Sequence, residues 1–530
     1  MISIYNILRK SWPFLTGLLL GLYFISFNVI GTNFSHFPGD LGDGRFTMYI
    51  LEHAYQYFSG QVPGFWDSDF MVPETRVITY SENMIGTAPF YALFRICKLD
   101  VETSFQAWFL MMTFLNYLFS YLFLKKCFKN TYSAVLGAMI FTFSMALQNQ
   151  MAHSQTFPRF AIPLAFYMAM RFNENLKPVY FLGALLAWVY QMYCGIYIGF
   201  LLLVPLSLFL FITAGIQWPV FKEQFQRIKW SASIAGSLLL SLILLAPLMY
   251  PYKIRSEQIP LNSYKDIFEN IPSLASHFFS MPGTLLWGSL KNFAIEYPAF
   301  WDHEIFAGGV ASLCLLSFWV IIIAKLIKPN LIKKVILVSS WKVMFLTSLL
   351  TFIFFIRFGH FSLYQYVHQI PGFGSMRAIQ RIINLELLYF AFATSFIVSL
   401  FLKKENLWTG LIFFMLAGVI ILDNYYVKGS SYVTSKELAQ ARRMALCQKM
   451  KNIPAGSLVS YEPSNMETRP IFYQIDAMFA AQLLHLRTVN GYTGAGPLGY
   501  SRFWNELSPE GRQEWFNKRN YKPDTVYVIN

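Results

Sequence analysis

Long apolar runs recur along this 530-residue chain and are separated by short polar connections. A run of about twenty apolar residues is long enough to cross a bilayer as a helix. The pattern therefore predicts an α-helical polytopic membrane protein with about eleven transmembrane helices. The expected spans are 12–31, 103–124, 131–148, 159–172, 179–194, 195–216, 230–250, 306–324, 335–356, 382–402 and 406–423.

Composition and charge support a membrane setting. The chain is 55% hydrophobic and only 13% charged, whereas a soluble protein carries roughly 25% charged residues. The net charge of +14 does not indicate a nucleic-acid partner, because the Lys and Arg residues lie mostly in short clusters between apolar runs. Such clusters mark cytoplasmic connections. They are Arg9/Lys10, Lys125/Lys126/Lys129, Arg171/Lys177, Lys222/Arg227/Lys229, Lys325/Lys328/Lys333/Lys334 and Lys403/Lys404.

The basic connections alternate with larger ones that are richer in Asp, Glu, His and Trp. This alternation predicts a cytoplasmic N-terminus and an extracytoplasmic C-terminal region. The outer regions are expected at 32–102, 251–305 and 424–530. The membrane domain is expected to end at 423, and the last of these regions follows it. In the first of them, helices near 44–60 and 82–97 are too polar or too short to span the bilayer, so we expect them to lie along its interface.

The region 424–530 has the composition of an ordinary soluble domain and predicts a small α/β fold. The stretch SKELAQARRMALCQKM has the pattern of a helix. GSLVSYEP, HLRTVNGY and DTVYVIN have the pattern of strands.

The first outer region opens with GDLGDGRF, which places Asp40 and Asp43 three residues apart among glycines. A bend there would turn both carboxylates toward one site, where one of them could act as a catalytic base. The alternative is a solvated loop in which Asp43 caps a helix that starts near Gly44. Ionisable groups beside a membrane span favour the functional interpretation.

Two further acidic segments are candidate parts of the same site. The stretch 65–89 mixes acids with aromatic rings, a combination that suits a sugar, and it contains Glu82. The motif YPAFWDHEIFAGG places Asp302, His303 and Glu304 directly before a span. Those three residues are expected to form a second wall of the site or a helix N-terminus. Asp40, Asp43 and Glu304 are the candidate ligands if a divalent cation (Mg, Mn or Ca) takes part, although no HExxH spacing is present.

Phosphate recognition is predicted at three outer arginines. Arg377 and Arg381 are four residues apart, which would place them on one helical face at the mouth of a span. Two such arginines can hold a diphosphate by forked hydrogen bonds, and Glu386 is expected to pair with one of them. His153 and Arg159 lie at the outer end of two further spans, where Arg159 could bind a lipid phosphate or act as a headgroup anchor.

The layout resembles the GT-C superfamily of membrane glycosyltransferases. The resemblance consists of a first span, a long outer loop that opens with acids at GDLGDGRF, two helices along the membrane and a soluble terminal domain. VITYSENMIGTAPFYALFR and PGFGSMRAIQRI are similar to segments of bacterial proteins of the YfhO type. The clearer acidic pairs of the superfamily, adjacent Asp-Glu or DxD, are replaced here by Asp-x-x-Asp.

The resemblance implies an inverting transferase in a bacterial cytoplasmic membrane. Its donor would be a sugar linked to polyprenyl phosphate, and its acceptor a glycan, lipid or protein on the outer face. Asp43 or Asp40 would be the base, and Arg377, Arg381 and Arg159 would stabilise the departing phosphate. The main alternative is a transporter or a flippase of lipid-linked glycans, which predicts mid-span charges and internal repeats. We find few of the first and none of the second. A glycan polymerase or ligase of another membrane fold and a non-catalytic binding protein are the remaining alternatives.

Overall fold

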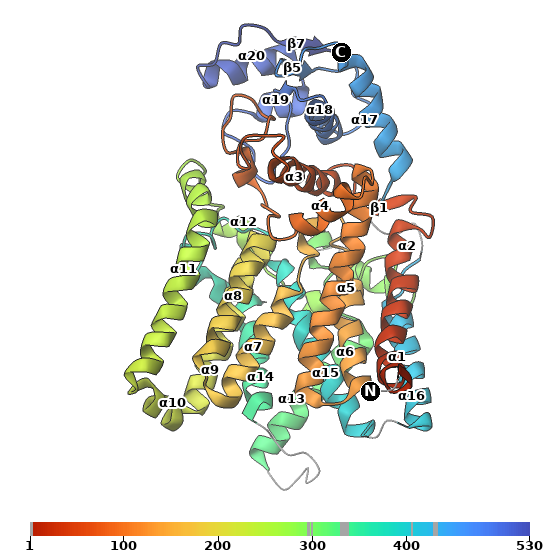
Figure 1. Ribbon diagram of the computed structural model, residues 1–530, viewed down its shortest axis with the longest axis vertical. Coiled ribbons are helices and arrows are strands. Elements are labelled where there is room, and N and C mark those ends of the chain that lie inside the picture. Colours follow the sequence, from red (N-terminus) through yellow and green to blue (C-terminus); the bar gives the residue numbers. More distant parts are fainter. Residues whose placement is uncertain (1–3, 294–296, 298–299, 329–338, 404–405, 428–432) are drawn as a thin grey trace.

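The fold is a bundle of apolar helices with a small α/β unit at one end (Figure 1). It is described from a computed structural model that covers residues 4–293, 297, 300–328, 339–403, 406–427 and 433–530. Helices occupy most of the described residues of all eleven predicted spans, and residues 335–338 of the span 335–356 lie outside the described part. The first consists of α1 (Ile4–Gly21), a π turn η1 (Leu22–Ser26) and α2 (Phe27–Ile30), and the others are α5 (Val101–Phe128), α6 (Thr131–Phe143), α7 (Ala161–Asn175), α8 (Pro178–Cys194), α9 (Ile196–Ile216), α11 (Ile228–Ser256), α13 (Gly309–Ile327), α14 (Ser339–Phe355), α15 (Ile383–Phe401) and α16 (Leu407–Asn424).

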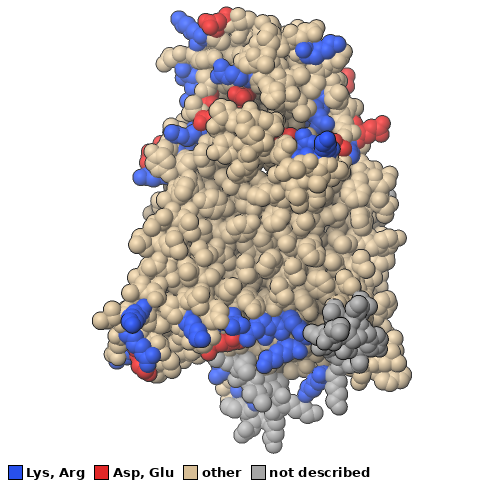
Figure 2. Space-filling model, viewed as in Figure 1, with Lys and Arg blue, Asp and Glu red and all other residues tan. Residues whose placement is uncertain are grey.

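Within the described residues, seven helices are long and apolar enough to cross a membrane by length and composition. These are the first one together with α5, α9, α11, α13, α15 and α16, while α6 and α14 are shorter apolar helices. The polytopic helical architecture is therefore confirmed, and the number of helices that cross the bilayer stays a prediction. Charge has the expected distribution, since an uncharged belt separates a band of Lys and Arg at the end that holds α10 (Trp218–Phe225) from a mixed-charge opposite end (Figure 2).

The outer end of the bundle carries the first long loop. There β1 (His36–Pro38) precedes α3 (Asp43–Phe58), and η2 (Val77–Tyr80) precedes α4 (Ala88–Ile96). The second predicted helix is shorter than expected because residues 82–87 form a loop and a turn before it, and Pro89 fits only the first turn of α4.

α3 packs against the C-terminal unit. It lies across the end of the bundle beneath α18 (Pro470–Leu483) of the C-terminal unit (Figure 1). Arg45 Nη1 and Asp476 Oδ1 are 2.6 Å apart, and the rings of Tyr49 and Phe479 meet edge to face at 5.5 Å. Most of α3 is thus covered by protein, and its position along the lipid interface stays a prediction.

The C-terminal unit contains a three-stranded parallel sheet in the order β6-β5-β7. Its strands are β5 (Leu458–Tyr461), β6 (Arg487–Thr488) and β7 (Tyr527–Ile529), which fall in the three predicted strand segments. Its helices are α17 (Lys436–Met450), α18, α19 (Ser501–Glu506) and α20 (Pro509–Lys518). β4 (Val433–Ser435) pairs antiparallel with β1, so the unit is hydrogen-bonded to the acidic loop that precedes α3.

The described part of the second outer region, 251–305, contains only short elements after the end of α11. They are α12 (Tyr264–Glu269), η5 (Ala275–Phe278), η6 (Gly288–Phe293) and η7 (Phe300–His303).

Candidate functional site

Two glycines fold the acidic loop tightly onto the start of α3. Gly39 has a φ of +105°, a conformation that residues with a side chain rarely adopt. A Cβ atom added at Gly39 would lie 2.5 Å from the Cα of Gly44, and one added at Gly44 would lie 2.6 Å from the Cα of Gly39. Only glycine at both positions allows this approach, which brings Asp40 over the first turn of α3.

Asp40 has a capping role in this turn. Its Oδ1 accepts hydrogen bonds from the backbone amides of Gly42 at 3.0 Å and Gly44 at 3.3 Å. Those amides belong to the group of unpaired donors that every helix leaves at its N-terminus. The capping alternative considered for Asp43 therefore describes Asp40.

Asp43 points toward polar groups from two distant parts of the chain. Its Oδ2 lies 3.2 Å from Nδ1 of His153, and its Oδ1 accepts a hydrogen bond from the hydroxyl of Tyr492 in the C-terminal unit. The side chain of Asp43 remains 26% exposed, so the carboxylate is ordered and reachable at the same time.

The two aspartates have opposite electrostatics. Burial raises the pKa of Asp43, but His153, the Tyr492 hydroxyl and the positive charge of Arg381 outweigh it, and the pKa is lowered from the ordinary value. Burial and the neighbouring charge of Asp43 raise the pKa of Asp40, against the hydrogen bonds of the two amides. Asp43 is therefore the member of the pair that stays ionised more readily.

The positive charge of Arg381 also lowers the pKa of Asp43. Arg381 lies in the 3-10 turn η9 (Ile379–Ile382), which leads into α15. Its guanidinium carbon is 4.7 Å from the centroid of the Tyr197 ring, and its charge acts on both Asp43 and Glu82. One of the two predicted arginines is thus in electrostatic contact with the acidic loop.

Glu82 binds the N-terminus of α9 beside Arg381. Its Oε2 accepts from the amide of Ile196 at 2.6 Å, and its Oε1 accepts from the amide of Tyr197 at 3.1 Å. Burial raises the pKa of Glu82 to about 7, against the charge of Arg381 and the two amides. Both oxygens are engaged by backbone, so Glu82 fixes the helix end that carries the ring under Arg381.

The paired-arginine geometry is wrong. Arg377 precedes η9 and is exposed, so it does not share a helical face with Arg381. Glu386 does not pair with either arginine, because its Oε2 is 2.9 Å from Nε2 of His277. The i, i+4 spacing failed here because the helix α15 begins only at Ile383.

Arg159 is buried inside the bundle. Its Nη1 donates to Oδ1 of Asn384 at 3.2 Å, and its Nη2 donates to the carbonyl of Phe141 at 3.2 Å. Asn384 also donates to the carbonyl of Arg381 at 2.9 Å. Arg159 is therefore linked to the turn that carries Arg381 and is only 3% exposed, so the expected position in the headgroup region is wrong.

The segment 302–304 has a different environment. His303 is a buried structural residue, with Nδ1 at 2.9 Å from Oγ of Ser276 and Nε2 at 2.9 Å from the carbonyl of Glu269. Asp302 is half-exposed and acts electrostatically on Tyr197. Glu304 is buried, and burial raises its pKa to about 7 against the charge of Lys291.

The donors around Asp43 do not fit a divalent cation. Within the part of the chain that the structure describes, no group of three or more His, Cys, Asp or Glu could hold a metal ion. One oxygen of Asp40 is engaged by amides, and the oxygens of Asp43 face His153 and Tyr492. The mechanism below therefore uses no metal.

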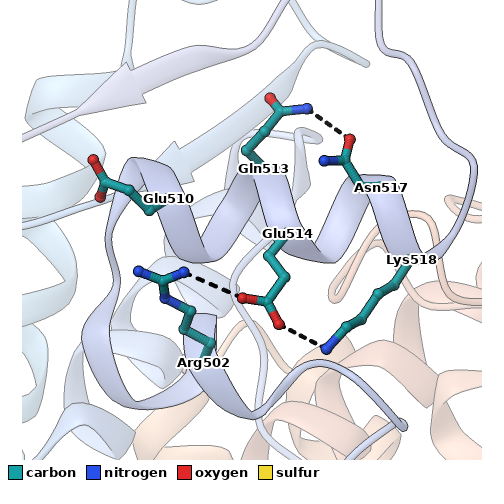
Figure 3. A pocket seen from close by; sticks show the side chains of 6 residues that line it. All are labelled: Arg502, Glu510, Gln513, Glu514, Asn517 and Lys518. Carbon is teal, nitrogen blue, oxygen red and sulfur yellow. Dashed lines mark hydrogen bonds and ion pairs between the residues drawn. The ribbon is translucent and has the colours of Figure 1, made fainter.

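A hollow on the C-terminal unit is separate from Asp43. It has a volume of about 600 Å³ and lies along α20 (Figure 3). Its polar groups bind one another, since Glu514 bridges Arg502 at 3.3 Å and Lys518 at 2.6 Å, and Gln513 donates to Asn517 at 3.0 Å. These pairs engage most of the polar lining, to which Glu510 also contributes.

Tyr492 was missed by the sequence interpretation. It follows β6 in a stretch that was assigned only as a strand, and no local motif marks it. Its ring stacks on Trp504 at a centroid distance of 5.4 Å and meets Phe46 of α3 edge to face at 5.2 Å. These contacts orient the hydroxyl toward Asp43, and they exist only once the C-terminal unit is placed over α3.

No protein-family profile matches the chain, and no curated protein matches it. Solved structures do resemble its fold. The apo oligosaccharyltransferase of Archaeoglobus fulgidus is 12% identical with a TM-score of 0.50, over 100% of this chain and 70% of that one. The arabinofuranosyltransferase AftD from Mycobacteria is 11% identical with a TM-score of 0.47, over 86% of this chain and 29% of that one. ArnT from Cupriavidus metallidurans bound to undecaprenyl phosphate is 9% identical with a TM-score of 0.41, over 90% and 89%. The chain therefore has a polytopic helical fold like that of the archaeal oligosaccharyltransferase.

Proposed function

We propose that this protein is an integral-membrane glycosyltransferase that moves a sugar from a polyprenyl-phosphate-linked donor to an acceptor hydroxyl on the extracytoplasmic face. The observation that carries the proposal is the setting of Asp43, a partly exposed carboxylate that contacts His153 and the Tyr492 hydroxyl. The positive charge of Arg381, from the other end of the membrane domain, also acts on it. Such a pair serves the two ends of a glycosyl transfer, the incoming hydroxyl and the departing phosphate. The likeness in fold to an archaeal oligosaccharyltransferase supports the reaction class.

Asp43 acts as the base in this proposal. Its carboxylate takes the proton of the acceptor hydroxyl as the acceptor oxygen bonds to the anomeric carbon. The bond from that carbon to the phosphate oxygen breaks on the opposite side, and the electron pair leaves with the phosphate. The configuration at the anomeric carbon is inverted. The hydrogen bond from Tyr492 and the contact with His153 hold the carboxylate in its ionised form.

Arg381 neutralises the charge that develops on the departing phosphate. Glu82 is a positioning residue, because it holds the N-terminus of α9, whose Tyr197 ring lies under Arg381. Asp302, whose charge acts on Tyr197, contributes to the wall of the same site.

The lipid tail of the donor lies between the helices of the bundle, and the acceptor is a glycan, lipid or protein. The basic band at the α10 end supports a cytoplasmic N-terminus and an extracytoplasmic C-terminal unit (Figure 2). We place the protein in a bacterial cytoplasmic membrane, on the resemblance to bacterial proteins of the YfhO type.

A transfer assay tests the proposal. The full chain, reconstituted in liposomes, is supplied with a panel of undecaprenyl-phosphate-linked hexoses and pentoses and with crude cell-envelope acceptors. Release of undecaprenyl phosphate coupled to labelling of an acceptor is expected for one member of the panel, and Asp43→Asn is expected to abolish it. Donor movement across the bilayer without release of the phosphate would contradict the proposal and favour a flippase.

A further inference from the structure

A small cavity lies inside the bundle, between the first helix, α5, α6 and the segment that connects α6 to α7. Its volume is about 30 Å³, which is room for roughly two water molecules. Its polar lining comes from Ser26, Thr113, Asn116, Thr142, Gln148 and Arg159, and the other lining side chains are apolar. A cavity with so many polar groups favours polar contents.

Arg159 brings a buried charge to this cavity. Its partners are the amide oxygen of Asn384, the carbonyl of Phe141 and the ring of Phe141 at 5.1 Å. All of these are uncharged, and no ion pair joins Arg159 to a carboxylate in the described chain. A guanidinium has five N–H donors, and the Nε of Arg159 is buried without a partner.

Two more buried atoms in the lining lack partners. They are Oγ1 of Thr142 and Oε1 of Gln148. A threonine hydroxyl can rotate to donate to an anion, and the Gln148 side chain can turn its amide N–H groups inward, since the two ends of an amide have nearly the same shape. A single acceptor in the cavity could therefore satisfy Arg159 and Thr142 together.

The first helix is interrupted at this place. Ser26, together with its neighbour Ile25, lines the cavity from the π turn η1. A π turn widens an α-helix by one residue and is frequently found at functional sites. The interruption thus coincides with the buried charge.

We propose that this cavity binds one monatomic anion of the size of chloride, which neutralises Arg159 inside the bundle. A buried charge without a counter-charge is unfavourable, and the cavity is the open space that Arg159 lines. Its volume fits an ion little larger than water and excludes a lipid phosphate with its attached groups. The proposal is independent of sugar transfer.

Anion exchange on the purified full chain in nanodiscs tests the site. Replacing sodium chloride with sodium gluconate at equal ionic strength is expected to lower Tm by roughly 3–6 °C, and bromide is expected to restore it. Diffraction at the bromine edge is expected to give an anomalous peak beside Arg159. Equal Tm in chloride and gluconate, without a bromide peak in the cavity, would show that water fills it and overturn the proposal.

Matched variants locate the effect. Thr142→Val and Arg159→Gln are expected to lose most of the difference between chloride and gluconate. Thr213→Val is the control, because Thr213 is equally buried with an unpaired hydroxyl but lies on α9, away from the cavity. If Arg159→Gln does not fold, Thr142→Val and the bromide map decide. A chloride effect that survives in Thr142→Val and occurs without a peak beside Arg159 would place the ion elsewhere and contradict the site.

Discussion

Two acidic segments lie in the outer regions of this protein, and their surroundings differ. In the loop 39–44, Asp43 faces a histidine, a tyrosine hydroxyl and an arginine, and its pKa is lowered. In the segment 302–304, His303 is tied to Ser276 and a backbone carbonyl, and burial raises the pKa of Glu304 to about 7. Both segments are acidic, but the pKa values of Asp43 and Glu304 shift in opposite directions.

The comparison shows that acids and a histidine in sequence do not by themselves define a base. A carboxylate acts as a base when it is ionised and reachable. The groups that lower the pKa of Asp43 are His153, Arg381 and Tyr492, which are far apart in the chain. The predictions below test whether this difference decides function.

The largest expected effect is at Asp43. Asp43→Asn removes the proton acceptor and is expected to lower kcat for sugar transfer about a thousandfold. Glu304→Gln, the matched change in the other segment, is expected to keep activity within about twofold of the wild type. Initial rates of acceptor labelling in the same liposomes measure both, and equal losses in the two variants would remove the distinction.

Substitution of Arg381 is expected to have the second-largest effect on sugar transfer. Arg381→Gln removes the charge that stabilises the departing phosphate, and kcat is expected to fall about a hundredfold. The control is Arg377→Gln, because that side chain is exposed and precedes the turn η9; its effect is expected to stay within about threefold. A larger loss for Arg377→Gln than for Arg381→Gln would contradict the assignment.

The close approach of Gly39 and Gly44 allows a test of whether the backbone of the acidic loop positions Asp43. Gly44→Ala places a Cβ atom 2.6 Å from the Cα of Gly39, so the acidic loop must move. Transfer is expected to fall about tenfold through misplacement of Asp43. Gly236→Ala is the control, since its added Cβ would meet nothing within 4 Å. Tm and transfer rates are compared for both, and equal effects would show that the close approach is unimportant.

Tyr492→Phe is expected to have a smaller effect that depends on pH. The lost hydroxyl no longer stabilises ionised Asp43, so the pKa of Asp43 rises and the acid limb of the kcat/KM profile moves to higher pH. Near the optimum the loss is expected to be about threefold. Tyr461→Phe, on β5, is expected to leave the acid limb in place. An unmoved limb in Tyr492→Phe would exclude control of Asp43 by this hydroxyl.

The smallest expected effect is that of Glu304→Gln on the pH dependence of thermal stability. Its pKa in the folded protein is raised to about 7, so folding favours the protonated form. This contribution is complete below the ordinary glutamate pKa and is lost as pH rises through about 7. The Glu304→Gln side chain cannot ionise. The Tm of this variant minus that of the wild type is therefore expected to increase as pH rises from about 5 to about 8. A Tm difference that is constant with pH would contradict the raised pKa.

Much of the bundle could be predicted from hydropathy, and much of the site could not. A long apolar run specifies a helix by itself, as α9 and α15 illustrate, and the glycines of GDLGDGRF correctly indicated a bend. The partners of Asp43 depend on tertiary contacts. Tyr492 reaches it only because the C-terminal unit packs on α3, and the 3-10 turn η9 separates Arg377 from Arg381 in a way that residue spacing does not reveal.

The central claim is that the donor phosphate meets Arg381 while the sugar meets Asp43. A structure of Asp43→Asn bound to a non-transferable undecaprenyl-phosphonate-linked sugar tests it most directly. We expect phosphonate oxygens at a hydrogen-bonding distance of about 3 Å from the Arg381 guanidinium, with the anomeric carbon facing residue 43. A headgroup seated against Asp302 and Glu304, with no contact to Arg381, would contradict the claim.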